Sequence, residues 1–167
     1  AGPLESELRS LAEHSLPGHV NWIGRLPQNE VSTAISQADC LVLPSRRDGW
    51  GAVVSEALMV GTPVICSDGC GAAGAALASG SGLVFRRDQI QELISCVDEV
   101  LARGPLSSEH RLSLATWGAS LGARAGAKYL AEIINHVYCK GERPPVPWLP
   151  LVPTTGALSI SSAGVKS

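Results

Sequence analysis

The chain has 167 residues, a length typical of one domain. Hydrophobic residues make up 45% of it and charged residues 17%, and the formal net charge at pH 7 is -2. Disorder of the whole chain requires high net charge and low hydrophobicity, so this composition excludes it. Nucleic-acid binding by bulk attraction is not supported either, because it uses a basic stripe or patch.

The first part of the sequence predicts two helices with a short strand between them. Residues 3–15 have helical spacing, which Pro17 and Gly18 end. HVNWIG, residues 19–24, is typical of a short strand. Asn29 can cap a second helix through residue 37. The apolar positions of the first helix are Leu4, Leu8, Leu11 and Ala12.

Three apolar runs in the middle of the sequence predict the strands of a parallel sheet. CLVLP, residues 40–44, is continuous enough to be buried on both faces. A helix over 51–60 separates it from a second buried strand at 63–67, and a third strand follows at 82–85. Short strands that alternate with helices predict an α/β fold with a Rossmann-like parallel sheet flanked by helices.

The last part of the sequence predicts three helices, at 89–103, 108–120 and 123–139. After residue 140 the composition changes to one rich in proline and serine. We therefore expect one domain over 1–140 and a disordered, unpacked tail over 141–167. The positions of the 89–103 helix expected to face inward are Ile90, Leu93, Ile94, Val97, Val100 and Leu101.

The five cysteines are expected to be free thiols, mostly buried, in a reducing compartment. Their number is odd, and Cys66 and Cys70 are too far apart for a CxxC redox pair. No apolar stretch approaches the ~20 residues of a membrane span, and the opening residues do not resemble a signal peptide. We therefore expect a cytoplasmic location, with contact to the cytoplasmic face of a membrane only through another part of a longer protein.

The loop over residues 45–51 is the candidate ligand site. In an open parallel sheet, ligands bind beyond the carboxyl ends of the strands, and this loop follows the first apolar run. Gly49 and Gly51 flank Trp50, so the backbone can approach a ligand closely. The helix that begins next has unpaired amides and the positive end of its dipole at its start, which suits a phosphate.

Glu56 is the second candidate functional residue. It is the only charged residue between Asp48 and Asp68, on an otherwise apolar helix. Burying a lone carboxylate costs free energy unless a polar group meets it, and a ribose or sugar with paired hydroxyls would do so. The alternative is that Glu56 points to water or caps a neighbouring loop.

The segment DGWGAVVSEALMVGTPVICSD, residues 48–68, resembles the nucleotide-sugar-binding signature of GT-B glycosyltransferases, especially the large retaining family four. The resemblance extends over about residues 2–139. It implies one incomplete GT-B lobe, the C-terminal, donor-binding one. The residues that match the family pattern are Pro44, Ser45, Gly49, Gly51, Glu56, Ala57, Gly61, Pro63 and Val64.

The resemblance also implies a role for each site residue. Glu56 would hold the ribose hydroxyls and Asp48 would contact the donor sugar, as the two catalytic-site carboxylates. The family has Glu where this chain has Asp48, which is shorter by about 1.5 Å of reach. Arg25 would lie where the base-binding edge begins. The donor-binding backbone would comprise Gly49, Trp50, Gly51, Ala52, Val53 and Val54.

The reaction implied is hexosyl transfer, with retention, from a nucleotide diphosphate sugar to an acceptor hydroxyl. No cofactor and no metal are expected, since the chain has no D-x-D motif. A glycan or lipid-linked acceptor would be held by an N-terminal lobe that this chain lacks. The family's diphosphate-binding Arg and Lys lie in strands that are lacking too. We expect the isolated chain to be inactive, to bind no nucleic acid and to self-associate.

Two alternatives belong to other functional classes. One is a nucleotide-binding module or fragment without activity of its own. The other is a dinucleotide-binding domain of NAD type, because GCGAAG at 69–74 is formally G-x-G-x-x-G. The dinucleotide interpretation is disfavoured, because the helix that follows has room only for residues 72–79.

Overall fold

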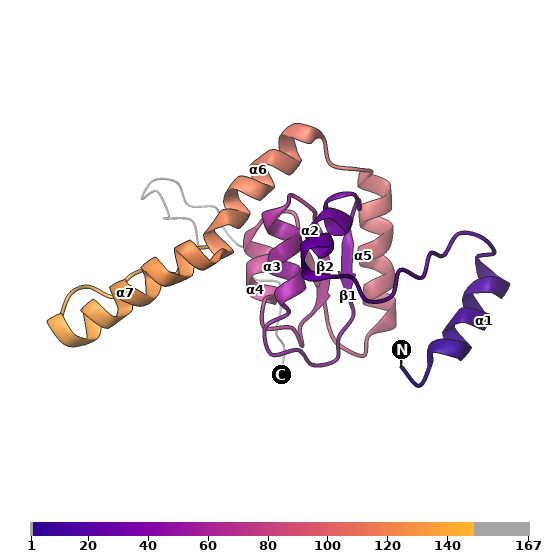
Figure 1. Cartoon of the computed structure of the whole chain (residues 1–167), viewed down its shortest axis with the longest axis horizontal. Helices are drawn as coiled ribbons and strands as arrows, with labels where there is room; N and C mark the ends of the chain where they lie inside the picture. Colours follow the sequence, from indigo (N-terminus) through magenta and orange to yellow (C-terminus); the bar gives the residue numbers. More distant parts are fainter. Residues whose placement is uncertain (1, 149–167) are drawn as a thin grey trace, which may run out of the picture.

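The computed structural model describes residues 2–148, which contain a three-stranded parallel sheet flanked by helices (Figure 1). The strands are β1 (Leu41–Leu43), β2 (Val64–Ser67) and β3 (Leu83–Phe85), in the order β1-β2-β3. Val42 pairs with Ile65, which pairs with Leu83. The α/β class and the three apolar strands predicted from the sequence are confirmed, each strand being slightly shorter than predicted.

Helices cover both faces of this sheet. Against one face pack α3 (Ala52–Met59) and α4 (Ala73–Ala78), and against the other packs α5 (Ile90–Arg103). Two further helices, α2 (Gln28–Ser36) and α6 (Ser108–Gly118), pack against α3. Helix α3, which follows the candidate loop, is therefore fixed from several sides.

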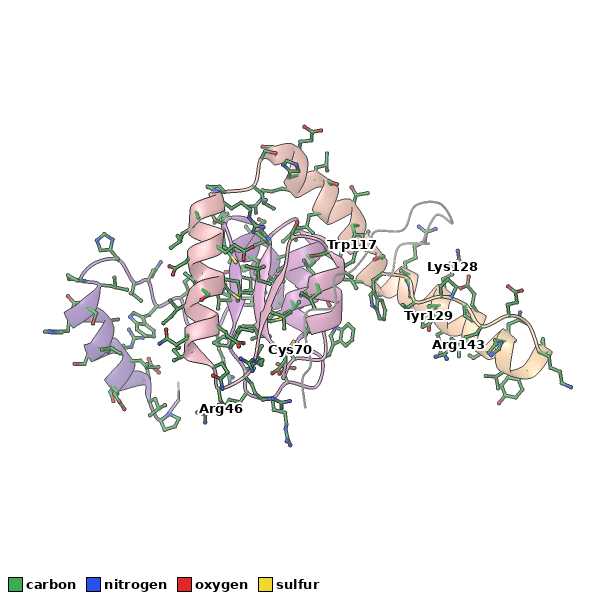
Figure 2. The ribbon with its side chains drawn as sticks, turned by 180° about the vertical axis from the view of Figure 1, so that it is seen from behind. Arg46, Cys70, Trp117, Lys128, Tyr129 and Arg143 are labelled. Carbon is green, nitrogen blue, oxygen red and sulfur yellow. The ribbon has the colours of Figure 1, made fainter. Side chains whose placement is uncertain are left out.

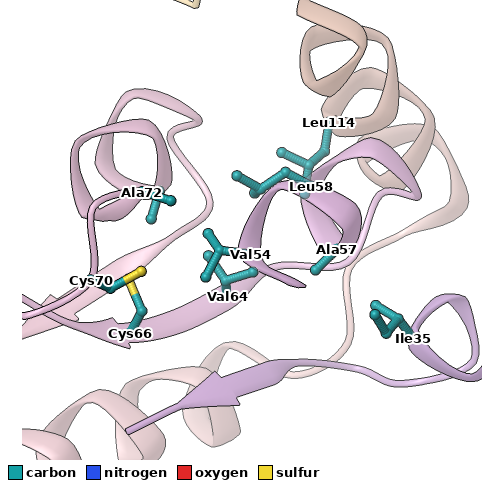
Figure 3. Close-up of a cluster of buried hydrophobic side chains, with 10 residues drawn as sticks. Ile35, Val54, Ala57, Leu58, Val64, Cys66, Cys70, Ala72 and Leu114 are labelled. Atoms are coloured by element: carbon teal, nitrogen blue, oxygen red, sulfur yellow. The ribbon is translucent and has the colours of Figure 1, made fainter. Parts of the chain in front are cut away.

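The buried core lies between the sheet and α3 (Figure 3). Val54, Leu58 and Val64 are at most 1% exposed. Leu114 of α6 and Ile35 of α2 belong to the same cluster and lie at its edge. Truncating one such leucine to alanine typically costs about 2–5 kcal/mol, so this packing is what holds α3 against the sheet.

The predicted burial was wrong at one edge of the sheet. Val42 of β1 is 41% exposed, because α5 packs on β2 and β3 but not on β1. The inward side of α5 was also overestimated. Leu93, Val97 and Val100 are half-buried, as predicted. The other three positions predicted to face inward are exposed, namely Ile90, Ile94 and Leu101.

The N-terminal region differs most from the sequence-based expectation. Helix α1 (Glu5–Ser15) lies apart from the sheet (Figure 1), held by Arg9, whose guanidinium lies 4.7 Å from the Trp22 ring centroid. Residues 19–24 form no strand, because no strand of the described chain lies beside them to pair with their backbone groups. Leu4, Leu8 and Leu11, three of the apolar positions of the predicted first helix, are exposed.

The start of α2 was also predicted incorrectly. The helix begins at Gln28 after Pro27, and its first turn has no side-chain cap. Asn29 therefore lies inside the helix instead of capping it. A proline has a fixed φ that suits the entrance of a helix, which explains a start two residues earlier.

The C-terminal region is a helical arm. A short 3-10 turn η1 (Ala119–Leu121) joins α6 to α7 (Ala123–Cys139), which projects from the body (Figures 1 and 2). Residues 141–148 form neither helix nor strand, and 149–167 of the predicted tail lie outside the described residues. Within 141–148 the tail is not unpacked throughout, because the Trp148 ring contacts Trp50 at a centroid distance of 5.9 Å. No helix among residues 2–148 has both the length and the hydropathy needed to cross a membrane.

Candidate functional site

The candidate loop is locked to the turn that follows β2. The amide of Asp48 donates to Gly69 O at 3.0 Å, and the amide of Gly71 donates to Asp48 O at 3.3 Å. A third bond runs from the amide of Ala72 to Trp50 O at 2.7 Å. These bonds hold the loop and the turn side by side at the carboxyl edge of the sheet.

Glycines allow this close approach. Gly51 has φ +84°, and a Cβ there would lie 2.3 Å from Cys70 Sγ. A Cβ on Gly71 would lie 2.3 Å from Gly49 O, and one on Gly69 would lie 2.3 Å from Arg46 O. The first two glycines of the G-x-G-x-x-G pattern thus pack against protein backbone, which explains the pattern without a dinucleotide.

Two cysteines lie beneath the loop. Cys70 Sγ donates to Trp50 O at 3.0 Å, and Cys66 beside it is fully buried (Figure 3). Burial raises the pKa of the Cys66 thiol to about 12, with the neighbouring Cys70 adding to the effect. Such a thiol is structural and not nucleophilic. None of the five cysteines forms a disulfide, as predicted, but Cys139 is exposed.

The start of α3 presents a run of amides without acceptors. The amides of residues 49–53 donate no hydrogen bond within the part of the chain that the structure describes. Gly49 is exposed, with open space where a Cβ would be. The prediction included the amide of Val54, which was wrong, because this amide donates to Gly51 O at 2.9 Å.

The Trp50 side chain is fixed on the first turn of the same helix. Its Nε1 donates to Ser55 Oγ at 3.0 Å, while Trp50 as a residue is 42% exposed. Ser55 itself is buried, 6% exposed. The indole therefore has a defined orientation beside the free amides.

Both predicted carboxylates are half-buried and keep acceptor capacity. Glu56 Oε1 accepts a long bond of 3.5 Å from Gln28 Nε2, at the start of α2. The Asp48 side chain has no hydrogen bond or ion pair with any described residue. Arg25 is exposed in the irregular segment before Gln28, and the structure does not bring it into contact with the other site residues.

Ion pairs occupy the neighbouring part of this edge. Arg46 Nε lies 2.8 Å from Asp88 Oδ1, and Arg87 Nε lies 3.4 Å from Asp68 Oδ1. Arg46 and Asp88 also line a hollow of about 280 Å³ with Pro44 and other residues. Figure 2 shows Arg46 and Cys70 at the same edge of the molecule. Arg46 is therefore already paired.

Arg111 of α6 is the structural residue that the sequence did not reveal. Its guanidinium donates to Ser36 O, at the last residue of α2, at 2.5 Å, and to Ala38 O, just after the helix, at 3.0 Å. It also donates to Thr62 Oγ1 at 3.0 Å, after α3. The side chain thereby joins the helices that carry Gln28 and Glu56. No local pattern could have indicated it, because its partners are 49 to 75 residues away.

A larger cavity, of about 660 Å³, lies at the opposite edge of the sheet, before β3. Polar side chains of its lining form hydrogen bonds with neighbouring residues of the same helix or turn. Ser107 caps α6 by accepting from the amide of His110, and Ser79 Oγ donates to Ala76 O. The carboxyl edge, with its free amides and carboxylates, is therefore the stronger candidate site.

These features define a class of protein. A Rossmann-like α/β lobe presents a glycine-bounded loop, the start of a helix and two acidic side chains at the carboxyl edge of its sheet. That is the arrangement of an open α/β lobe that binds a ligand beyond the carboxyl ends of its strands.

The chain belongs to the glycosyl transferases of group 1, whose family model matches residues 1–115. It is 28% identical over 143 residues to the glycogen synthases of Mycobacterium tuberculosis strains CDC 1551 / Oshkosh and ATCC 25618 / H37Rv. The matched region covers 84% of this chain and 34% of each relative, so the chain spans about a third of their length. No solved structure matches the chain. The family resemblance predicted from the sequence is confirmed.

Proposed function

We propose that this chain is the donor-binding part of a glycosyltransferase and that it binds a nucleotide diphosphate sugar at the start of α3. The observation that carries the proposal is the run of free amides at residues 49–53, flanked by Asp48 and Glu56 with unused acceptors. A diphosphate needs hydrogen-bond donors, and a ribose needs an acceptor for paired hydroxyls. Both are present side by side along one helix.

The diphosphate would bind the amides of residues 49–53. These amides lie at the positive end of the α3 dipole, which favours an anion there by ~0.3–1 kcal/mol, and more where partly buried. Gly49 leaves open space on the side that a phosphate would approach. Arg47 is exposed next to the loop and adds positive charge.

The ribose would bind Glu56. Hydrogen bonding of the ribose hydroxyls to a charged carboxylate contributes ~1.5–3 kcal/mol to binding. The Gln28 amide, 3.5 Å from Glu56 Oε1, supports the carboxylate from α2. Arg25, three residues before Gln28, would lie toward the base.

Asp48 would contact the donor sugar. In the transfer, the bond from the anomeric carbon to the diphosphate oxygen breaks, and a bond from that carbon to the acceptor oxygen forms with retention. The acceptor hydroxyl proton passes to the released diphosphate, so no external reagent is needed. A glycan acceptor is favoured over a lipid-linked one by the glycogen synthase relatives.

The acceptor would be held by a second lobe outside these 167 residues. The chain spans about a third of its relatives' length, which leaves room for such a lobe in a longer protein. We therefore expect the chain alone to bind donor without transferring its sugar. A nucleotide-binding module without activity would bind nucleotide equally well, and only transfer by the longer protein separates the two.

The substitution Glu56→Ala tests the ribose role. Titration calorimetry with ADP, GDP and UDP should give binding to the unmodified chain, weakened in the variant by roughly 10- to 150-fold. Glu99→Ala is the matched control, because Glu99 is an exposed glutamate on α5. An equal dissociation constant for Glu56→Ala and the unmodified chain would refute the ribose role.

A further inference from the structure

The C-terminal segment returns to the candidate site. After α7 ends at Cys139, His136 Nδ1 contacts Gly141 O, and the chain runs back alongside the helix (Figure 1). The Trp148 ring then meets the Trp50 ring edge to face, with a centroid distance of 5.9 Å and an interplanar angle of 63°. Trp50 lies between the two glycines of the candidate loop.

The length and stiffness of this segment fit the return path. A helix of 17 residues such as α7 is about 25 Å long. The six residues 141–146 could span about 19 Å at about 3.1 Å each, and a turn at residues 147–148 follows them. Residues 143–148 read Arg-Pro-Pro-Val-Pro-Trp, so three prolines stiffen the return and reduce the entropy lost on ordering it. We name residues 143–148 the C-terminal strap.

The contact at the end of the strap is with a fixed partner. The bond of 3.0 Å from Trp50 Nε1 to Ser55 Oγ holds the Trp50 ring in one orientation. Trp148 therefore packs against a ring whose orientation is already fixed. Trp148 is half-buried in this position. Trp50 is itself part of the run of free amides at residues 49–53, so Trp148 makes its contact on a residue of the proposed donor site.

We propose that the C-terminal strap is an autoinhibitory device, in which Trp148 covers the donor loop through Trp50 and must leave before a nucleotide diphosphate binds. This role rests on the proposed donor site. An edge-to-face aromatic pair shifts a local equilibrium by a factor of about 2 to 12. The strap would therefore weaken donor binding without abolishing it.

The first arm of the test needs no ligand. The full chain labelled with 5-fluorotryptophan gives one fluorine resonance for each of its four tryptophans, and single Trp→Phe variants assign them. Trp148→Ala should shift the Trp50 resonance, whereas Trp22→Ala should not. Trp22 is a matched control, since it is 40% exposed and lies beside α1. An unchanged Trp50 resonance in Trp148→Ala would overturn the strap.

The second arm measures binding of ADP, GDP and UDP by calorimetry. Trp148→Ala should bind about 2- to 12-fold more tightly than the unmodified chain, while Trp148→Phe and Trp22→Ala should bind like the unmodified chain. Equal affinity in Trp148→Ala would overturn autoinhibition and leave the donor site standing. If no variant binds any of the three nucleotides, the proposed donor site fails and the gating role fails with it, even where the fluorine data show the tryptophan contact.

Discussion

At the start of α3, Gly51 leaves no room for a side chain. Its φ of +84° disfavours other residues, and a Cβ would collide with Cys70 Sγ. Gly51→Ala should lower the free energy of unfolding by about 2–4 kcal/mol, from left-handed backbone strain and overpacking together. Urea unfolding measures it, with Gly49→Ala as control because that position is open. Equal stability of the two variants would contradict this account of the loop.

Arg111 links the end of α2 to the end of α3, through two backbone carbonyls and the Thr62 hydroxyl, in a way that no shorter side chain can replace. Arg111→Ala should lower the free energy of unfolding by about 1.5–3 kcal/mol, the scale of hydrogen bonds from a charged donor. Arg124→Ala, at an exposed arginine of α7, should stay within about 0.5 kcal/mol of the unmodified chain. Thermal unfolding measures the stability of both variants. If Arg111→Ala loses as little stability as Arg124→Ala, the linking role is refuted.

At the scale of secondary structure, the sequence predicted correctly those elements whose own residue pattern is enough to show that they are buried. The run VICS is uniformly buried as β2, and the glycine-bounded segment before it became α3, as its pattern indicated. The strand predicted over residues 19–24 is absent, because a strand needs a neighbouring strand that its own pattern cannot supply. The predicted first helix is present as α1, with its leucines exposed. Val42 is exposed because α5 packs on β2 and β3 but not on β1.

The same distinction explains what the sequence predicted of the site. The candidate loop and the carboxylates at its two ends were identifiable, because they lie within one short stretch. The interactions of Arg111 and Trp148 were not, because each contacts residues far away in the sequence. The Val54 amide was assigned wrongly, because it donates to Gly51 O in the first turn of α3, a hydrogen bond that the sequence pattern did not reveal.

For the whole molecule, the apolar side chains of α7 form an exposed surface. Leu130 is 59% exposed, Ile134 49% and Val137 63%, on a helix that projects from the body (Figure 2). Apolar patches of several hundred Å² promote association. We expect the average mass in sedimentation equilibrium to rise with concentration, and the double substitution Leu130→Glu with Ile134→Glu to reverse the rise.

Leu112→Glu is the control for that experiment, because Leu112 is 69% exposed on α6 and not on α7. It should leave the association unchanged. A monomer at every concentration would show that the surface of α7 does not drive self-association.

Amide chemical shifts of the ¹⁵N-labelled full chain, titrated with ADP, GDP and UDP, test the donor site most directly. The largest changes should occur at the amides of residues 49–53, with a smaller change at the side-chain amide of Gln28 beside Glu56. The cavity lined by Ser79, His110 and Trp117 should show none. Changes confined to that cavity, or no change at millimolar nucleotide, would contradict binding at the start of α3.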